Sequence, residues 1–179
     1  AHCVEAFCSS HYHPMSQGMA LEGMRLVKDY LPRAYADGTD LEARAHMMSA
    51  ASMGATAFQK GLGAIHALSH PIDAIYHTHH GTTNAVCMPA VLQFNKPAIT
   101  EVITKAASYL NIAGGFDGFC AYVDELNASL GIPKNLTGLG IKNVDIDRVV
   151  AGALIDPSTG GNPITMTKEN TTKLLLEIV

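Results

Sequence analysis

The chain has 179 residues, of which 47% are hydrophobic and only 16% are charged, and its formal net charge is −4. Basic residues form no run, so nucleic acid and anionic membranes are excluded as the main partner, and no apolar run is long enough to cross a bilayer. The length suits one domain with a sizeable core. The low charge indicates that part of the surface is normally covered.

The chain begins with AHCVEAFCSS, in which residues 1–8 already read as the interior of an amphipathic helix. A helix usually begins with a residue that caps its free N–H groups, and none is present here. We therefore expect the chain to continue a longer protein. The four cysteines are Cys3, Cys8, Cys87 and Cys120. They form no C-x-x-C pair, which favours reduced thiols in a cytoplasmic protein.

Helical patterns then follow one another closely. Apolar residues at helical spacing predict a helix over 14–31, with Pro32 perturbing its end. After the stop signal ADG, Thr39 and Glu42 fit a T-x-x-E capping box, which predicts a helix over about 40–60. This helix is rich in small and pliable side chains (Ala, Ser, Gly and Met), which suit close contact between helices.

The second half of the chain is also helical in pattern. Further helices are predicted over about 63–75, ending shortly after Pro71, and over about 82–94, bent by Pro89. Others are predicted over 97–110, 116–130, 145–154 and 168–178, with Gly131 and Pro133 as a stop. Strand alternation and hairpin dipeptides are missing. The pattern predicts one all-α domain, a bundle of about eight helices spanning 1–179.

Five of the nine histidines lie between His66 and His80. His66 and His70 are four residues apart and share a helix face. A short turn can return His80 to that helix, and His2 lies on the first helix. Imidazoles from three segments form a candidate first shell for a divalent transition metal such as Zn, Fe, Ni or Co, whereas Ca²⁺ and Mg²⁺ prefer oxygen. The alternative is ordinary core and surface histidines. The pattern lacks the Glu of H-E-x-x-H, which argues against a zincin-type protease.

The stretch GLGAIHALSHPIDAIYHTHHGTTNAVCMPAVLQFN closely resembles the signature of the iron-containing (group III) alcohol dehydrogenases. The resemblance covers the whole chain, because AHCVEAFCSS is similar to the first helix of that family's helical domain. The segment DPSTGGNPITMTKENTTKLLLEIV is similar to the family's ending. The resemblance implies the C-terminal helical, dehydroquinate synthase-like domain.

The resemblance also implies an N-terminal α/β domain, upstream of Ala1, that binds NAD or NADP through a glycine-rich loop. The chain itself shows no such loop after a strand. Gly114-Gly115 lies between predicted helices and is a better helix break than a nucleotide loop.

The family holds its metal with one Asp and three His. Carried over by motif, the three histidines are His2, His66 and His80, and the Asp would lie four residues before His2, ahead of Ala1. His70 matches a histidine beside the substrate, for which the resemblance implies a catalytic role in relaying a proton or in positioning; the alternative is a residue that only orients the site. His77 and His79 receive no assigned role. Asp73 stands where many members have Gly, and we expect it to face solvent.

The implied reaction is reversible oxidation of a small alcohol to an aldehyde or ketone by hydride transfer to NAD or NADP, with Fe²⁺ or Zn²⁺ as the metal. Family members are commonly dimers, so the implied protein is a cytoplasmic enzyme that can form a homodimer. Two alternatives stay open. One is a stand-alone helical metal-binding or sensor module without catalysis, and the other is a structural helical domain whose histidines are fortuitous.

Overall fold

The computed structural model describes residues 1–179 and contains eight α-helices, three short 3₁₀ segments and no strand. The all-α prediction is confirmed. No helix combines the length and apolar character needed to span a membrane. The helices are α1 (His2–Cys8), α2 (Pro14–Ala36), α3 (Leu41–Ala57), α4 (Ala64–Tyr76), α5 (His80–Tyr109), α6 (Gly115–Ser129), α7 (Ile146–Ile155) and α8 (Lys168–Leu176).

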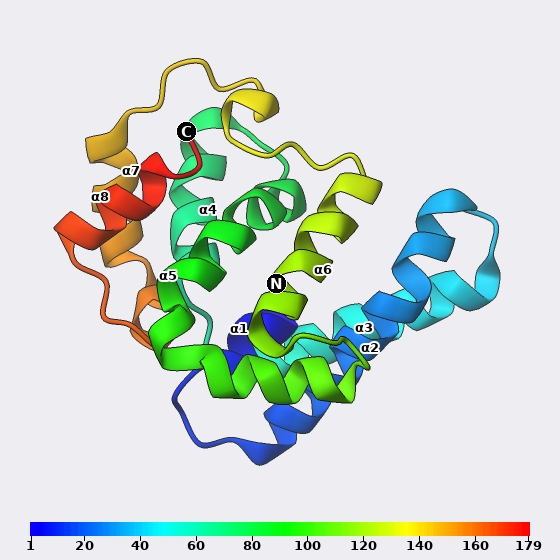
Figure 1. Ribbon diagram of the computed structural model, residues 1–179. Coiled ribbons are helices and arrows are strands. Elements are labelled where there is room, and N and C mark those ends of the chain that lie inside the picture. Colours follow the sequence, from blue (N-terminus) through cyan, green and yellow to red (C-terminus); the bar gives the residue numbers. More distant parts are fainter.

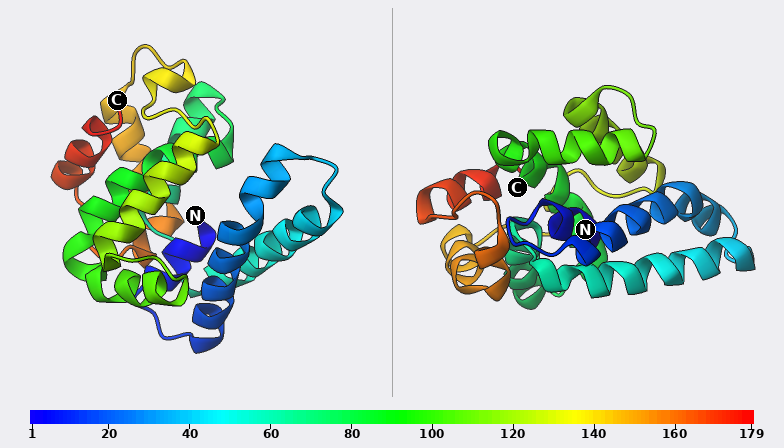
Figure 2. Two further views of the ribbon diagram at one scale, coloured as in Figure 1. Left: turned by 45° about the vertical axis from the view of Figure 1, so that its right-hand side comes forward. Right: turned by 90° about the horizontal axis from the view of Figure 1, so that it is seen from below.

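Two apolar cores share the long helix α5 (Figure 1). The first core combines α1, α2, the second half of α5, and α6. The second core combines α4, the first half of α5, α7 and α8. Helices α2 and α3 form a hairpin that projects from this body, as both views in Figure 2 show. Helix α1 contributes to the first core and α4 to the second, so the place where they meet α5 lies at the junction of the two cores.

Helix α5 continues through a region where the sequence predicted two separate helices. The separate helices expected over 82–94 and 97–110 are one helix, α5, with Pro89 and Pro97 inside it. Pro89 has no N–H to donate to the carbonyl of Ala85 four residues earlier. The side-chain amide of Asn127 donates to that carbonyl instead, at 2.9 Å. Tertiary structure thus satisfies the group that Pro89 frees, and the helix continues.

The helix ends lie where capping residues and glycines predict them, except at the start of α3. The cap of α3 is Asp40, whose carboxylate accepts from the N–H of Ala43 at 3.0 Å, whereas Thr39 bonds to Asp37. The predicted T-x-x-E box was therefore wrong by one residue. The predicted stop at Gly131 is confirmed, since this residue follows α6 with φ of 69°. Gly114 lies between α5 and α6 as a helix break, with no strand before it.

A buried lysine holds the C-terminal end of α1. Lys60 is 3% exposed, and its ammonium donates to the carbonyls of Ala6 at 2.9 Å, Phe7 at 3.1 Å and Ser9 at 2.6 Å. The last carbonyls of a helix have no partner within it and attract cations. Burial lowers the pKa of Lys60, which reflects the cost of placing a charge there. Lys60 fixes the position of α1 and of the side chains it carries.

We expect Lys60→Met to lower the free energy of unfolding by about 2–3 kcal/mol, because three buried carbonyls lose a charged donor. Lys105→Met is the matched control, since Lys105 is exposed on α5 and its replacement should change stability by less than about 0.5 kcal/mol. Urea unfolding of the two variants measures the difference. Equal stability of both variants would show that the ammonium does not hold α1.

Candidate metal centre

The N-terminus of α4 is capped by side chains from two distant segments. The Oε1 atom of Glu5 accepts from the N–H of Ile65 at 2.7 Å, and the Oδ1 atom of Asn162 accepts from the N–H of Ala64 at 3.0 Å. Gly63 precedes them, and a Cβ there would lie 2.8 Å from Asn162 Oδ1 and 3.3 Å from Glu5 Oε1. The glycine lets both caps approach the helix, which ties α1 and the segment near 162 to α4.

Four imidazoles gather beside this capped helix. Ring centroids lie 4.8 Å apart for His2 and His66, 5.3 Å for His66 and His80, 5.6 Å for His66 and His70, and 5.5 Å for His70 and His80. His66 is buried, whereas the side chains of His70 and His80 are 42% and 47% exposed. The structure thus brings together all four histidines that the sequence singled out.

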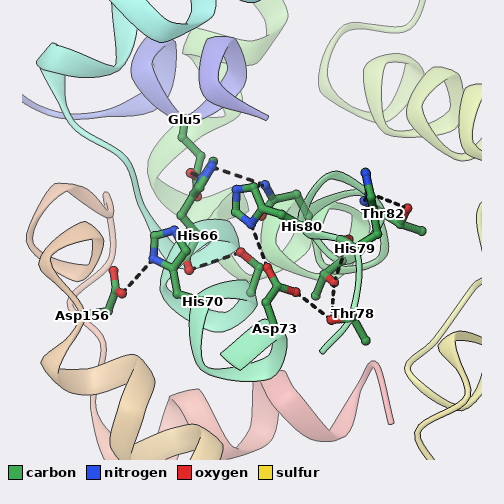
Figure 3. A network of polar contacts seen from close by, with 12 residues as sticks. Glu5, His66, His70, Asp73, Thr78, His79, His80, Thr82 and Asp156 are labelled. Carbon is green, nitrogen blue, oxygen red and sulfur yellow. Dashed lines mark hydrogen bonds and ion pairs between the residues drawn. The ribbon is translucent and has the colours of Figure 1, made fainter. Parts of the chain in front are cut away.

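Three of the four imidazoles bind a carboxylate through Nδ1 (Figure 3). Glu5 bonds to His66 at 2.5 Å, Asp73 to His80 at 2.7 Å, and Asp156 to His70 at 2.8 Å. A carboxylate accepts only, so it assigns the proton to Nδ1 and leaves the lone pair on Nε2. Each ring therefore has an unprotonated Nε2 that can accept a hydrogen bond, and in His66 and His80 this atom accepts from the side-chain amide of Asn84.

The Nε2 atoms of His66 and His80 face one point. Both lie near the Nδ2 atom of Asn84, at 3.3 Å and 3.1 Å. Asn84 is 5% exposed, and its Oδ1 atom is buried without a hydrogen-bond partner. A cavity of about 280 Å³ is lined by residues that include Ala1, His2, His66, His80, Asn84 and Met88. Two neutral imidazoles with lone pairs directed at one place fit a divalent transition metal.

His2 lies in the same cluster but is turned differently. Its ring is nearly parallel to that of His66, with an interplanar angle of 8°, and its centroid lies 5.1 Å from that of the Phe58 ring. A nitrogen lone pair lies in the ring plane, so parallel rings cannot direct theirs to a common atom. No group of three His, Cys, Asp or Glu side chains is arranged to hold a metal ion in this structure. The ring of His2 must rotate to join the other two.

Burial keeps His2 neutral. Burial, as the largest cause, together with the positive charges of the nearby imidazoles and of the N-terminal amine lowers the pKa of His2 to about 4. The neutral imidazole is the form that binds metal. Near pH 7 the ring is therefore free of the proton that would compete with a metal ion.

The turn between α4 and α5 uses two further histidines for structure. His77 ends α4 in a left-handed conformation with φ of 54°, and His79 caps α5 by accepting from the N–H of Thr82 through Nδ1 at 3.4 Å. Asp73 was expected to face solvent, and this was wrong. Its side chain is 17% exposed and bonds to His80 and to the hydroxyl of Thr78.

Sequence reasoning missed Glu5, Asn84 and Asp156. Glu5 lies three residues after His2 and Asn84 four after His80, so each shares a helix face with a predicted ligand. That spacing was the available signal. Asp156 opens the segment DPSTGGNP, where no spacing links it to His70. Burial by itself would raise the pKa of Asp156, but hydrogen bonds from the Ser158 N–H and from His70 outweigh it and the pKa is lowered.

Comparison with known proteins finds one family along the whole chain. The model of the Fe-containing alcohol dehydrogenase family, C-terminal, matches residues 1–179. The 4-hydroxybutyrate dehydrogenase of Cupriavidus necator is 41% identical over 172 residues, which is 91% of this chain and 45% of that protein. The NAD-dependent methanol dehydrogenase of Bacillus methanolicus is 32% identical and covers 98% of this chain and 48% of its own.

Solved structures agree with the fold. A crystal structure of 1,3-propanediol oxidoreductase superimposes with a TM-score of 0.93 at 30% identity, over 99% of this chain and 49% of that one. An iron-containing alcohol dehydrogenase from Thermococcus thioreducens superimposes with a TM-score of 0.86, also at 30% identity, over 99% of this chain and 47% of that one. The chain therefore spans about half the length of the relatives it matches.

Proposed function

The chain belongs to the Fe-containing alcohol dehydrogenase family, and from this premise we propose that it is the metal-binding half of a NAD(P)-dependent alcohol dehydrogenase. The complete enzyme would oxidise a small alcohol reversibly to an aldehyde or ketone. The other half would be an α/β nucleotide-binding domain preceding Ala1. The coverage of the relatives supports this division, because the chain matches 45–49% of the first relatives in each comparison.

One observation carries the proposal: the Nε2 atoms of His66 and His80 both lie within 3.3 Å of one amide nitrogen, that of Asn84. In the proposed site these two atoms and Nε2 of a rotated His2 hold Fe²⁺ or Zn²⁺, with an Asp from the preceding segment as the fourth ligand. When bound, the metal supplies positive charge that lowers the pKa of the alcohol hydroxyl and favours hydride loss. The neutral imidazoles leave that charge largely uncancelled.

We propose that His70 moves the proton of the alcohol. It lies one helical turn after His66, and its ring stacks on that of His80 at 15° with the side chain 42% exposed. The Asp156 carboxylate holds a proton on Nδ1 of His70, so Nε2 of His70 can accept a second proton. The Asp156 carboxylate then stabilises the imidazolium that forms. The exposed ring can release the proton to solvent.

We expect His70→Ala to lower kcat by roughly 10²–10⁴-fold, the usual contribution of a positioned acid–base group, while the metal content stays at the native level. Steady-state kinetics and metal analysis of the same sample measure both. His46→Ala on α3, away from the site, should leave both quantities unchanged. Loss of metal along with activity would place His70 among the ligands instead.

The substrate class follows from the relatives. Those described above are named for 4-hydroxybutyrate, methanol and 1,3-propanediol, each of which carries a small primary alcohol. We propose the same class for this protein.

The exposed apolar side chains of Tyr12, Met15, Leu41, Met48 and Ile155 support further contacts with the nucleotide-binding domain and with a second copy in a homodimer. The four free cysteines support a cytoplasmic location.

The test is alcohol oxidation by the protein that contains this chain and its nucleotide-binding domain. NAD and NADP are each supplied with 4-hydroxybutyrate, 1,3-propanediol and short primary alcohols. We expect reduced nicotinamide to form, activity to vanish after treatment with a chelator, and Fe²⁺ or Zn²⁺ to restore it. Metal binding without turnover of any of these alcohols would instead support a helical metal-binding module without catalysis.

A further inference from the structure

We propose that Glu5 and Asp73 are positioning residues that determine the metal affinity of the site, because each holds a ligand histidine with the proton on Nδ1 and the lone pair on Nε2. The inference rests on the proposed function, since it assumes that His66 and His80 bind the metal. Neither carboxylate touches the metal in this proposal. Each acts through the hydrogen bond that it accepts from an imidazole.

Glu5 joins two elements of the site with its two oxygens. Oε2 accepts from His66 Nδ1 and Oε1 accepts from the N–H of Ile65, one residue before that histidine. The carboxylate is 6% exposed, so water does not replace either bond. Both the ring of His66 and the start of its helix are therefore placed by one buried side chain from α1.

A glutamine at position 5 cannot do the same. It has one oxygen for two N–H donors, so its NH₂ group must face either Ile65 or His66. If the NH₂ group faces Ile65, two N–H donors face each other and no hydrogen bond forms there. Facing His66, it makes Nδ1 an acceptor and transfers the ring proton to Nε2, which removes the lone pair that the metal needs. Glu5→Gln thus impairs the ligand in either orientation.

Asp73 performs the same task for His80 from the last turn of α4. Its Oδ2 atom accepts from His80 Nδ1 at 2.7 Å, and Oδ1 accepts from the Thr78 hydroxyl at 2.7 Å. These bonds span the turn between α4 and α5. An asparagine here keeps one oxygen for His80, and its NH₂ can donate to the Thr78 hydroxyl oxygen. Asp73→Asn therefore preserves the tautomer, whereas Asp73→Ala abolishes the acceptor.

Asp156 provides a matched comparison. It bonds to His70 Nδ1 at 2.8 Å, in the same manner as the other two carboxylates, but His70 is not one of the proposed ligands. If carboxylates matter only through local charge, Asp156 should influence metal binding as well. If they matter by aiming a ligand, it should not.

The experiment is a Co²⁺ titration of the protein that contains this chain and its nucleotide-binding domain, followed by visible absorption, with Zn²⁺ competition for absolute affinity. We expect Glu5→Gln to weaken binding about 100-fold and Asp73→Ala about 10-fold, the range known for partners of ligand histidines. Asp73→Asn and Asp156→Ala should stay within about threefold of the native protein. The Co²⁺ spectrum should change in Glu5→Gln and Asp73→Ala only.

Asn162→Ala separates aiming from helix capping, because Asn162 caps the neighbouring N–H of α4 without touching His66. We expect it to lower the melting temperature yet bind Co²⁺ within about threefold of the native protein. Native affinity in both Glu5→Gln and Asp73→Ala overturns the inference, as does an equal loss in Asn162→Ala and Glu5→Gln. A native protein that binds no Co²⁺ contradicts the proposed function itself.

Discussion

Replacing His66 with alanine is expected to remove the metal and the alcohol dehydrogenase activity together. His66 is 1% exposed and is bonded to Glu5, and its Nε2 atom faces the point shared with His80. In the proposed site the alanine removes a ligand from the centre of the cluster. Metal analysis and turnover in the complete enzyme should both fall to background. Retained metal stoichiometry would show that His66 is not a ligand.

Stability must be measured beside metal content, because the same substitution leaves the Glu5 carboxylate buried without its partner. Breaking a buried pair costs about 3–5 kcal/mol, so part of the loss could come from unfolding. His80→Ala avoids this problem, since its partner Asp73 lies nearer to solvent. We expect His80→Ala to lose metal with a smaller change in melting temperature. His46→Ala, on α3, should keep the native metal content and melting temperature.

Replacing Gly161 with alanine is expected to destabilise the domain by about 3 kcal/mol, at the upper end of typical overpacking costs. A Cβ at this position would lie 2.2 Å from the carbonyl oxygen of Leu62 and 3.1 Å from its nitrogen. Both are backbone atoms, so neither segment can give way by changing a rotamer. The neighbouring residue Asn162 caps α4, and Asp156 at the start of the same segment holds His70.

Gly160→Ala is the matched control, because nothing lies within 4 Å of a Cβ built at Gly160. The two variants change the same residue type in adjacent positions. Urea unfolding should show a large loss for Gly161→Ala and a change below about 0.5 kcal/mol for Gly160→Ala. Similar stability of the two variants would contradict the close approach to Leu62.

Sequence periodicity predicted the helical class and most helix positions, because apolar spacing and glycine stops are local properties. It was wrong where a distant group changed the local outcome. Separate helices were predicted over 82–94 and 97–110, yet α5 runs through both ranges with Pro89 and Pro97 inside it. At Pro89, Asn127 supplies a donor to the carbonyl of Ala85 from another helix. Thr39 reads as a cap, but Asp40 takes that role one residue later. Local sequence rules identify the residues that can cap or end a helix, and the tertiary structure determines which of them do so.

The histidines divide in the same way. Their spacing in the sequence placed His66 and His70 on one helix face and offered imidazoles from three segments, His2 and His80 included, as a candidate metal shell. The resemblance to a family then assigned His2, His66 and His80 as the ligands. Only the tertiary structure showed that all four rings gather, that the lone pairs of His66 and His80 meet at Asn84, and that His2 lies parallel to its neighbour. The identity of the ligands remains a prediction that the substitutions above can test.

The sequence by itself determined the all-α class, the family and the candidate ligands, because these depend on residue types at fixed spacing. Only the tertiary structure decided which carboxylate holds which imidazole. Glu5 is 61 residues from His66, and Asp156 is 86 residues from His70. Asp73, though only seven residues from His80, depends on the turn that reverses the chain between α4 and α5. A hydrogen bond needs its two atoms within about 3 Å of each other. For residues this far apart in the chain, the sequence does not say which carboxylate and which imidazole meet.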